Sequence, residues 1–186
     1  MGHIKLLIVP IGRIRGPWLD RLLHDLAHGL AMEIQLSRPL PYPPHAFSPT
    51  RQKFFSHAMV ELLRNVAGNV DFVLGLTDAE LYSVQANSTF SEVHLSSRSA
   101  IIGLGPFRDF LVGDRPEELM RERIYKEVLY TLGKMLGLST CINPHCVMYP
   151  SRGLLELDLK QPRFCLECRF KLYLRLGNIP LLKEAA

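Results

Sequence analysis

The sequence has no uninterrupted apolar run of the roughly 20 residues that a membrane-spanning helix needs. The apolar stretch from Ile4 to Val9 is short, contains Lys5 and stops at Pro10, which is unlike a signal peptide. Internal repeats and low-complexity tracts are also missing. We therefore expect a cytoplasmic protein without a membrane partner, in a compartment where thiols stay reduced.

The sequence also lacks a large excess of charge of one sign. The 22 basic and 18 acidic residues leave a formal net charge of +4, and the basic residues are scattered. Such a small excess argues against nucleic acid as a partner. The basic stretch at residues 163–175 keeps nucleic-acid binding as a minor alternative. With 47% apolar residues over 186 positions, the chain is long enough for a single domain, residues 1–186, around one core.

The first part of the chain has the pattern of a βαβ unit. Residues 3–9 are apolar and β-branched and predict a strand that ends at Pro10. Residues 17–30 carry leucines at helical spacing and predict an amphipathic helix. Residues 32–36 predict a second strand, which a right-handed crossover would pair in parallel with the first.

Helices and strands continue to alternate after this unit. We expect a proline-rich loop at 37–49, a helix from 50 to about 67, a strand at 71–76 with a helical turn at 77–78, strands at 90–95 and 100–104, a long helix from Pro116 to about 136 capped by Asp114 or Arg115, and a basic helix at 162–176. The predicted fold class is α/β (α+β), a twisted mixed sheet of about five strands with helices packed on it.

All four cysteines lie near the end of the chain, at Cys141, Cys146, Cys165 and Cys168. The C-x4-C and C-x2-C pairs have 18 residues between them, and such short loops let four thiolates converge on one zinc ion. In a reducing compartment this spacing favours zinc over two disulfides, which stay the alternative. Four thiolates leave no position for water, so this zinc would be structural and would anchor a C-terminal part, residues 138–186, to the α/β part, residues 1–137.

The cysteine spacing is also part of a longer pattern. The chain resembles the archaemetzincins, metzincin-clan zinc proteases marked by HExxHxxGxxHCx4CxMx17CxxC. The corresponding segment reads YTLGKMLGLSTC from Tyr130 to Cys141, then CVM from Cys146 to Met148, and then CLEC from Cys165. The resemblance implies a metzincin-like fold in which Gly137 makes the turn out of the helix and Met148 is the methionine of the Met-turn.

The same resemblance implies that the catalytic zinc site is lost. Tyr130, Lys134 and Thr140 stand where the family pattern has its three histidine ligands, and Thr131 stands where it has the general-base glutamate. Catalytic zinc needs three good ligands and a carboxylate that takes a proton from water. We therefore expect one structural Zn²⁺ and no catalytic zinc. Our hypothesis is that the Lys134 ammonium lies near the vacated metal position and partly replaces its charge.

Other residues offer little with which to rebuild a catalytic centre. His24 and His28 lie four residues apart on a predicted helix, but no glutamate follows His24, so they predict an exposed helix face. We expect His145 to be a loop residue beside the structural zinc and Glu127 to be an exposed helix residue. The remaining histidines, which belong to no motif, are His3, His45, His57 and His94.

The function that follows is that of a pseudoprotease, a protein of the protease family that binds peptide or protein without cleaving it. Residues Ala100, Ile101, Ile102, Gly103 and Leu104 are the candidate edge strand for adding a peptide strand, since Gly103, Gly105 and Pro106 suggest an irregular edge. The alternative is an active hydrolase with a non-standard centre that uses Lys134, Tyr130 or Glu127.

Overall fold

The computed structural model describes residues 4–14, 16–66, 68–109 and 116–176, and its centre is a five-stranded mixed sheet. The strand order is β2-β1-β5-β8-β7, with β2 at Met32–Leu36, β1 at Ile4–Ile11, β5 at Phe72–Thr77, β8 at Ser99–Gly103 and β7 at Ser91–His94. The first four strands are parallel, and β7 is antiparallel to β8. The predicted mixed sheet and the parallel βαβ start are confirmed.

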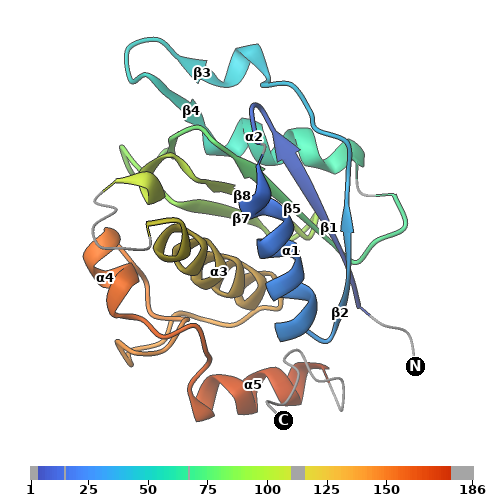
Figure 1. Cartoon of the computed structure of the whole chain (residues 1–186), viewed down its shortest axis with the longest axis vertical. Helices are drawn as coiled ribbons and strands as arrows, with labels where there is room; N and C mark the ends of the chain where they lie inside the picture. Colours follow the sequence, from blue (N-terminus) through green and yellow to red (C-terminus); the bar gives the residue numbers. More distant parts are fainter. Residues whose placement is uncertain (1–3, 15, 67, 110–115, 177–186) are drawn as a thin grey trace.

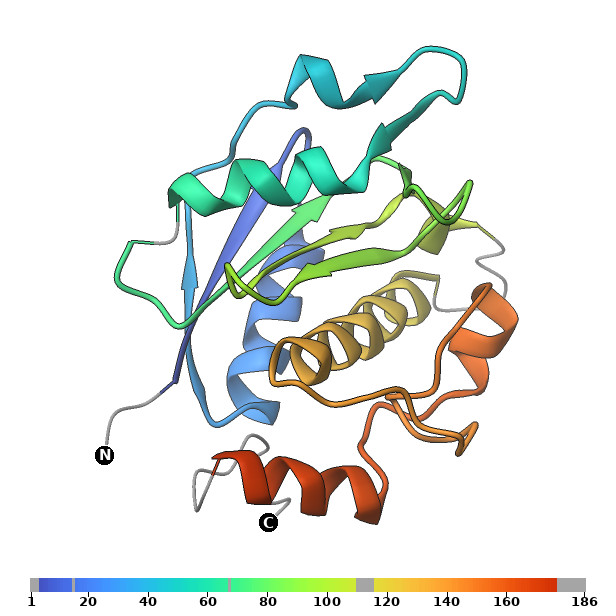
Figure 2. The same ribbon diagram turned by 180° about the vertical axis from the view of Figure 1, so that it is seen from behind.

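Helices cover both faces of this sheet (Figure 1). Helix α2 (Ser56–Leu63) packs on one face, and α1 (Pro17–Gly29) and α3 (Pro116–Met135) pack on the other. The segment after α3, with α4 (Leu154–Leu159) and α5 (Leu166–Leu176), lies against the outer side of α3 (Figure 2). The core on the α3 face therefore includes residues from both the α/β part and the cysteine-bearing part.

Strand β1 does not end at Pro10 as predicted, but continues to Ile11. The carbonyl of Pro10 faces the β2 side and accepts a hydrogen bond from Leu40 N at 2.8 Å. β2 has already ended there, at Leu36 opposite Ile8, so the missing proline N–H removes no bond from the main ladder.

The predicted helix over residues 50–67 is wrong in its first turn. Residues Lys53–Phe55 form strand β4, which pairs with β3 (Phe47–Ser48) and β6 (Leu81–Tyr82) in a second, three-stranded sheet. Aromatic packing decides the difference, because the Phe54 ring lies against those of Phe47 and Tyr42. After Leu63 the chain continues as a short 3₁₀ turn, Arg64–Val66. In the proline-rich segment before β3, Pro44–Ala46 also forms a 3₁₀ turn. The helical turn expected at 77–78 is absent, since β5 runs through Thr77.

The predicted edge strand is also wrong. β8 lies between β5 and β7 and is buried throughout, and the edge strand on that side of the sheet is β7. Gly103 has a different role from the one inferred, because a Cβ there would come within 2.8 Å of Leu81 Cγ and 2.9 Å of Ala79 O. The glycine marks the place where β6 and the chain before it cross close over β8. After β8, Gly105–Arg108 forms a 3₁₀ turn.

The long helix α3 is confirmed from Pro116 to Met135, while its predicted cap at Asp114 or Arg115 lies outside the described residues, as does His3. The C-terminal helix is shorter than predicted, and the short helix α4 was not predicted. A buried arginine joins these parts, since Arg123 donates to both carboxylate oxygens of Asp158 at 2.7–2.8 Å and to the carbonyls of Phe107 and Asp109. None of the described helices has the length and apolar character needed to cross a membrane.

Candidate functional site: the cleft between β7 and α3

A cleft of about 560 Å³ opens beside the edge strand β7. Its walls come from the start of α2, the turn after β6, the edge of β7 and the last turns of α3. The lining residues from β7 are Ser91, Glu92 and Val93, and those from α3 are Tyr130 and Lys134. The cleft therefore borders both an open sheet edge and the helix that carries the family's metal-binding pattern.

The main chain of β7 presents hydrogen-bonding groups to this cleft. Gly103 N donates to Phe90 O at 2.9 Å, so Phe90 and Glu92 turn their N–H and C=O groups toward β8. In an antiparallel pair the residues between them face the other way. Ser91 and Val93 therefore point their main-chain groups toward the open edge, where the Ser91 carbonyl also accepts a bond from Thr89 Oγ1.

The structure brings together only two of the four positions at which the family motif is altered. Tyr130 and Lys134 lie one helical turn apart on α3 and both line the cleft. Thr131 is fully buried and does not line the cleft, and its hydroxyl has no hydrogen-bond partner among the described residues. Thr140 is exposed in the loop after α3 and does not line the cleft.

A buried lysine that sequence analysis missed lies beneath Tyr130. Lys160 is 2% exposed, and its ammonium lies 4.9 Å from the centre of the Tyr130 ring. It donates to the carbonyls of Val147 and Tyr149, on either side of Met148, at 3.2 and 3.1 Å. The fixed cation next to the first altered ligand position is thus Lys160. The Lys134 ammonium makes no ion pair or hydrogen bond within the described part of the chain.

Glu127 is the acidic partner of this arrangement, and the prediction that it is exposed is wrong. Its side chain is buried at 3% exposure and accepts a 2.6 Å hydrogen bond from Ser91 Oγ. Burial raises the pKa of Glu127, although the Lys160 charge and the Ser91 hydrogen bond act in the opposite direction. Burial likewise lowers the pKa of Lys160 and raises that of Tyr130, whose phenol is further held neutral by the Glu127 charge. The spacing of Glu127 on α3 does not reveal this burial, because the layer that covers it comes from distant parts of the chain.

Met148, which the family resemblance identifies as the methionine of the Met-turn, packs beneath the motif helix. It is fully buried against α3, and a Cβ on Gly133 would come within 2.4 Å of its sulfur. Gly137 has φ +83°, the left-handed conformation that ends a helix and favours glycine. The scaffold around the altered motif is therefore kept.

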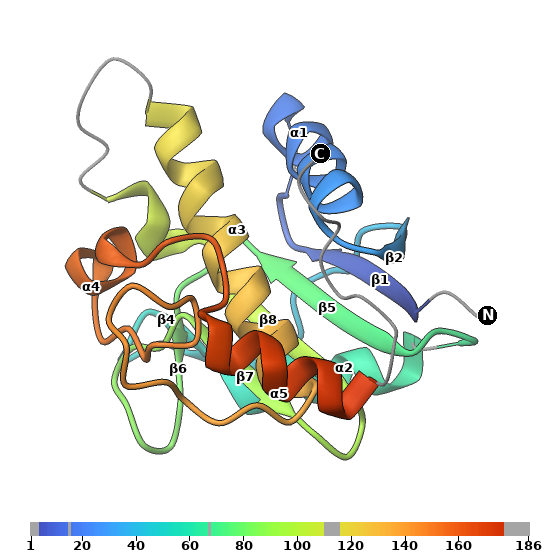
Figure 3. The ribbon, with the colours of Figure 1, turned by 90° about the horizontal axis from the view of Figure 1, so that it is seen from below.

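The segment from the end of α3 to α5 lies beside α3 (Figure 3), and the four cysteines on it converge. Their sulfurs all lie within 4.8 Å of one another, and Cys141 Sγ and Cys165 Sγ are 3.8 Å apart. A disulfide would need about 2.05 Å. Two thiolates at about 2.3 Å from one tetrahedral zinc lie about 3.8 Å apart, so the geometry fits zinc and not a disulfide.

Main-chain amides support this cluster. Met148 N and Cys165 N donate to Cys146 Sγ at 3.4 and 3.3 Å, and Asn143 N approaches Cys141 Sγ at 3.5 Å. Such donors stabilise the negative charge of a metal-bound thiolate. His145 is exposed in the same loop and is not part of the cluster, as expected. Among the described residues, these four cysteines can hold one zinc ion.

Comparisons with known proteins agree with the motif and the fold. The model of peptidase family M54 matches residues 40–173. The archaemetzincin of Methanopyrus kandleri is 37% identical over 127 residues, 68% of this chain and 69% of that protein, and the archaemetzincin of Pyrococcus abyssi is 31% identical over 180 residues, 92% and 95%. The crystal structure of the M. kandleri protein superposes with a TM-score of 0.80 at 33% identity, over 95% of this chain and 97% of that chain. The Archaeoglobus fulgidus archaemetzincin, solved in complex with malonate, gives 0.78 at 26% identity, over 90% and 99%.

We predict that Cys146→Ser lowers the zinc content by one ion per chain and the thermal stability by more than 10 °C. Three remaining thiolates hold zinc more weakly, and a structural zinc contributes on the order of 10 kcal/mol to folding in small modules. Zinc content would be measured by mass spectrometry of the metal and stability by circular dichroism. His145→Ala is the matched control and should change neither quantity. An unchanged zinc content in Cys146→Ser would contradict the assignment.

We predict a pH-dependent loss of stability when Lys160 is replaced by methionine. The buried Glu127 then has no nearby cation, so its folded-state pKa rises further above the unfolded value. A raised folded pKa favours folding at low pH, and this contribution is lost as the pH rises through the folded pKa. Urea unfolding should show a loss of about 3 kcal/mol at pH 8 and a smaller loss at pH 5.

The double variant Glu127→Gln/Lys160→Met is the control for this charge effect. It lacks the same hydrogen bonds to Val147 and Tyr149 as the single variant, but buries no carboxylate. It should recover most of the pH-dependent loss. Equal losses for the single and double variants at both pH values would show that the two charges do not interact.

Proposed function

Because the chain belongs to the archaemetzincins, the zinc metallopeptidases of family M54, we propose that it is a member without a catalytic zinc, which binds an extended peptide segment and does not cleave it. The main support for this proposal is the chemistry of the side chains that stand at the zinc-ligand positions of the motif. Of the two zinc ions in the family pattern, the chain would then bind only the one at the four cysteines, and this zinc would stabilise the fold. A cytoplasmic location is part of the proposal, since reduced thiols are needed to bind that zinc.

The residues at the altered motif do not fit a catalytic zinc. Such a site needs three ligands with available lone pairs and negative or neutral charge. Tyr130 is a phenol whose pKa burial raises, so it stays protonated near neutral pH. Lys134 brings an ammonium into the same cleft, and Thr140 lies outside it.

The buried positive charge beneath the cleft also disfavours a catalytic zinc. A metal dication near Tyr130 would be repelled by the buried Lys160 ammonium 4.9 Å from the ring. The general-base position of the motif holds no carboxylate, because Thr131 stands there and is buried, and the nearby Glu127 is enclosed and hydrogen-bonded to Ser91 Oγ. The carboxylate of Glu92, which lines the cleft, is held by Ser56 and His57. Glu127 therefore gives little support to the alternative of a hydrolase with a non-standard centre.

The edge of β7 supplies the binding part of the proposal. An extended peptide can add to a sheet edge through main-chain hydrogen bonds, with alternate side chains entering pockets. Ser91 and Val93 direct their main-chain groups into the cleft, and Tyr130 and Lys134 form the opposite wall. The predicted peptide surface thus moves from residues 100–104 to β7, while the predicted mode of binding is retained.

We predict that the protein with one zinc ion bound at the cysteine cluster cleaves neither denatured casein nor a mixture of random-sequence fluorogenic peptides. The altered motif offers no set of ligands for a metal-bound water and no carboxylate at the general-base position, so the usual stabilisation of hydrolysis in this family is missing. Rates would be compared with buffer alone and after treatment with a chelator. Cleavage that is sensitive to the chelator, or that disappears in Lys134→Ala, would contradict the loss of catalysis and favour the non-standard hydrolase.

We predict that Val93→Pro weakens peptide binding about fivefold while the protein stays folded. Proline removes one N–H that faces the open edge, where proline is tolerated, and one hydrogen bond contributes about 1 kcal/mol. The probe would be peptides selected from a phage-displayed random decapeptide library, with affinity measured by fluorescence anisotropy.

Val93→Ala is the matched control for this substitution. It shortens the same side chain but keeps the N–H, so it should bind the selected peptides within about threefold of the parent protein. Equal affinities of the proline and alanine variants would show that the β7 edge does not bind peptide. A library that yields no binding peptide would overturn the binding part of the proposal.

A further inference from the structure

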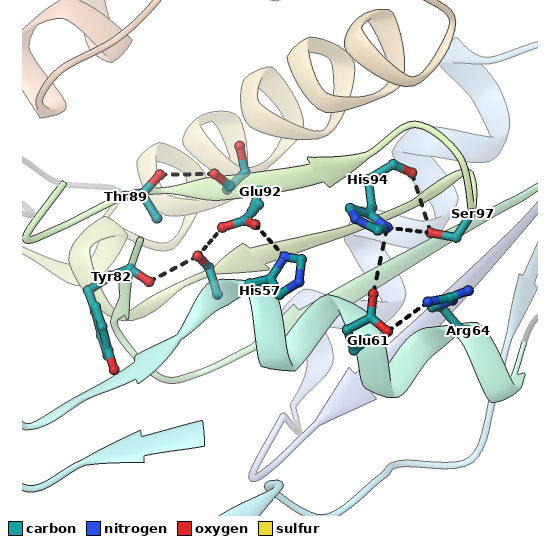
Figure 4. Close-up of polar contacts among 10 residues, drawn as sticks. His57, Glu61, Arg64, Tyr82, Thr89, Glu92, His94 and Ser97 are labelled. Atoms are coloured by element: carbon teal, nitrogen blue, oxygen red, sulfur yellow. Dashed lines mark hydrogen bonds and ion pairs between the residues drawn. The ribbon is translucent and has the colours of Figure 1, made fainter. Parts of the chain in front are cut away.

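Two histidines without a sequence motif come together on the α2 face of the sheet. His57 and Glu61 lie one turn apart on α2, and His94 ends strand β7 beside them (Figure 4). Each offers one ligand atom, and these three atoms all lie within 4.8 Å of one another. Apart from the cysteines, this is the one group of metal-binding side chains at such a spacing in the part of the chain that the structure describes.

The three side chains lie close to one another. His94 Nδ1 lies 3.7 Å from Glu61 Oε1, and the rings of His57 and His94 have their centres 5.3 Å apart. Ligands bound at 2.0–2.2 Å from one tetrahedral ion are about 3.4 Å apart. Small rotations of these partly exposed side chains would close the remaining gap, without movement of the main chain.

Neighbouring groups hold the candidate ligands in place. Arg64 donates to Glu61 Oε2 at 2.9 Å, which leaves Oε1 turned toward His94. Glu92 Oε1 lies 3.3 Å from His57 Nδ1, and its other oxygen accepts a hydrogen bond from Ser56 Oγ. Since a carboxylate only accepts, this contact puts the proton on His57 Nδ1 and leaves Nε2 free. Carboxylates orient metal-binding histidines in this way.

We propose that His57, Glu61 and His94 bind one divalent transition-metal ion, such as Zn²⁺. Two imidazoles and one carboxylate suit zinc and its neighbours in the first transition row better than calcium or magnesium. The side chains of His57, Glu61 and His94 are 48%, 38% and 30% exposed, so a fourth position would stay open to water. Glu61 and Glu92 together would balance the charge of the ion.

This site is separate from the altered motif. Glu92 and His94 point to the α2 face of the edge strand, while Ser91 points to the α3 face and bonds Glu127. His57 and Glu92 nevertheless line the cleft that Tyr130 and Lys134 also line. The metal would therefore sit at one wall of the proposed peptide cleft, and its binding is independent of whether the cleft takes a peptide.

The test is calorimetric titration of the full chain, with its cysteine zinc in place, with ZnCl₂. We expect one further binding event per chain in the parent protein and none in His57→Ala/His94→Ala. Glu92→Gln, which removes only the orienting carboxylate, should weaken this event about 10-fold to 100-fold. Glu61→Gln conserves the shape of the side chain and is the variant to use if the double variant fails to fold. It should also abolish the additional zinc-binding event.

The stacked pair His24 and His28 on α1 is the matched control, since it has the same i, i+4 spacing without the third ligand. His24→Ala/His28→Ala should bind the additional zinc as the parent does. Titration with Co²⁺ adds a spectroscopic readout, because a site without thiolate gives no sulfur-to-cobalt charge-transfer bands. No additional event in the parent protein, an event that persists without His57 and His94, or one lost with His24 and His28 would each overturn the proposal.

Discussion

Helix α3 is enclosed on both sides, and the arrangement of the cleft depends on how its buried charges are satisfied. Arg123 and Lys126 reach Asp158 in the following segment, and Glu127 is paired with Ser91 on the sheet side and lies near Lys160. An unpaired buried charge costs several kcal/mol, so these contacts require the C-terminal segment to close over the helix. The four cysteines lie in that segment, and a zinc ion bound to them would hold it in its closed position.

In the proposed function, this enclosure lets the scaffold of a protease persist without a catalytic zinc. Met148 and Gly137 serve packing and chain direction, and the cysteines serve the closure of the segment; none of these roles needs a second zinc. In the proposed function, the Lys160 ammonium beneath Tyr130 supplies fixed positive charge close to where the family pattern places a metal ligand. The fold is then stable without the ion that would define the enzyme.

The features that the sequence predicts correctly are those whose signal is local. The parallel βαβ start, the long helix and the cysteine cluster follow from periodicity and spacing within short segments. The predictions that are wrong concern features that tertiary contacts decide: Phe54 and Phe55 have helix-compatible spacing but pair with β3 and β6, and the glycines around Gly103 suggested an edge although they permit a close crossing. Glu127 has the spacing of a surface residue, yet Ser91 and Lys160, from a strand and a distant loop, bury it.

The sequence by itself determined the family, the four thiolates and the identities of the side chains that stand in the altered motif, because these properties depend on residue type and spacing along the chain. Only the tertiary structure decided which strand is the edge, which lysine is the buried cation, and that His57, Glu61 and His94 meet. These features depend on the packing of α2 and α3 on opposite faces of the sheet. Residues far apart in sequence become neighbours there, and no local pattern records their distance.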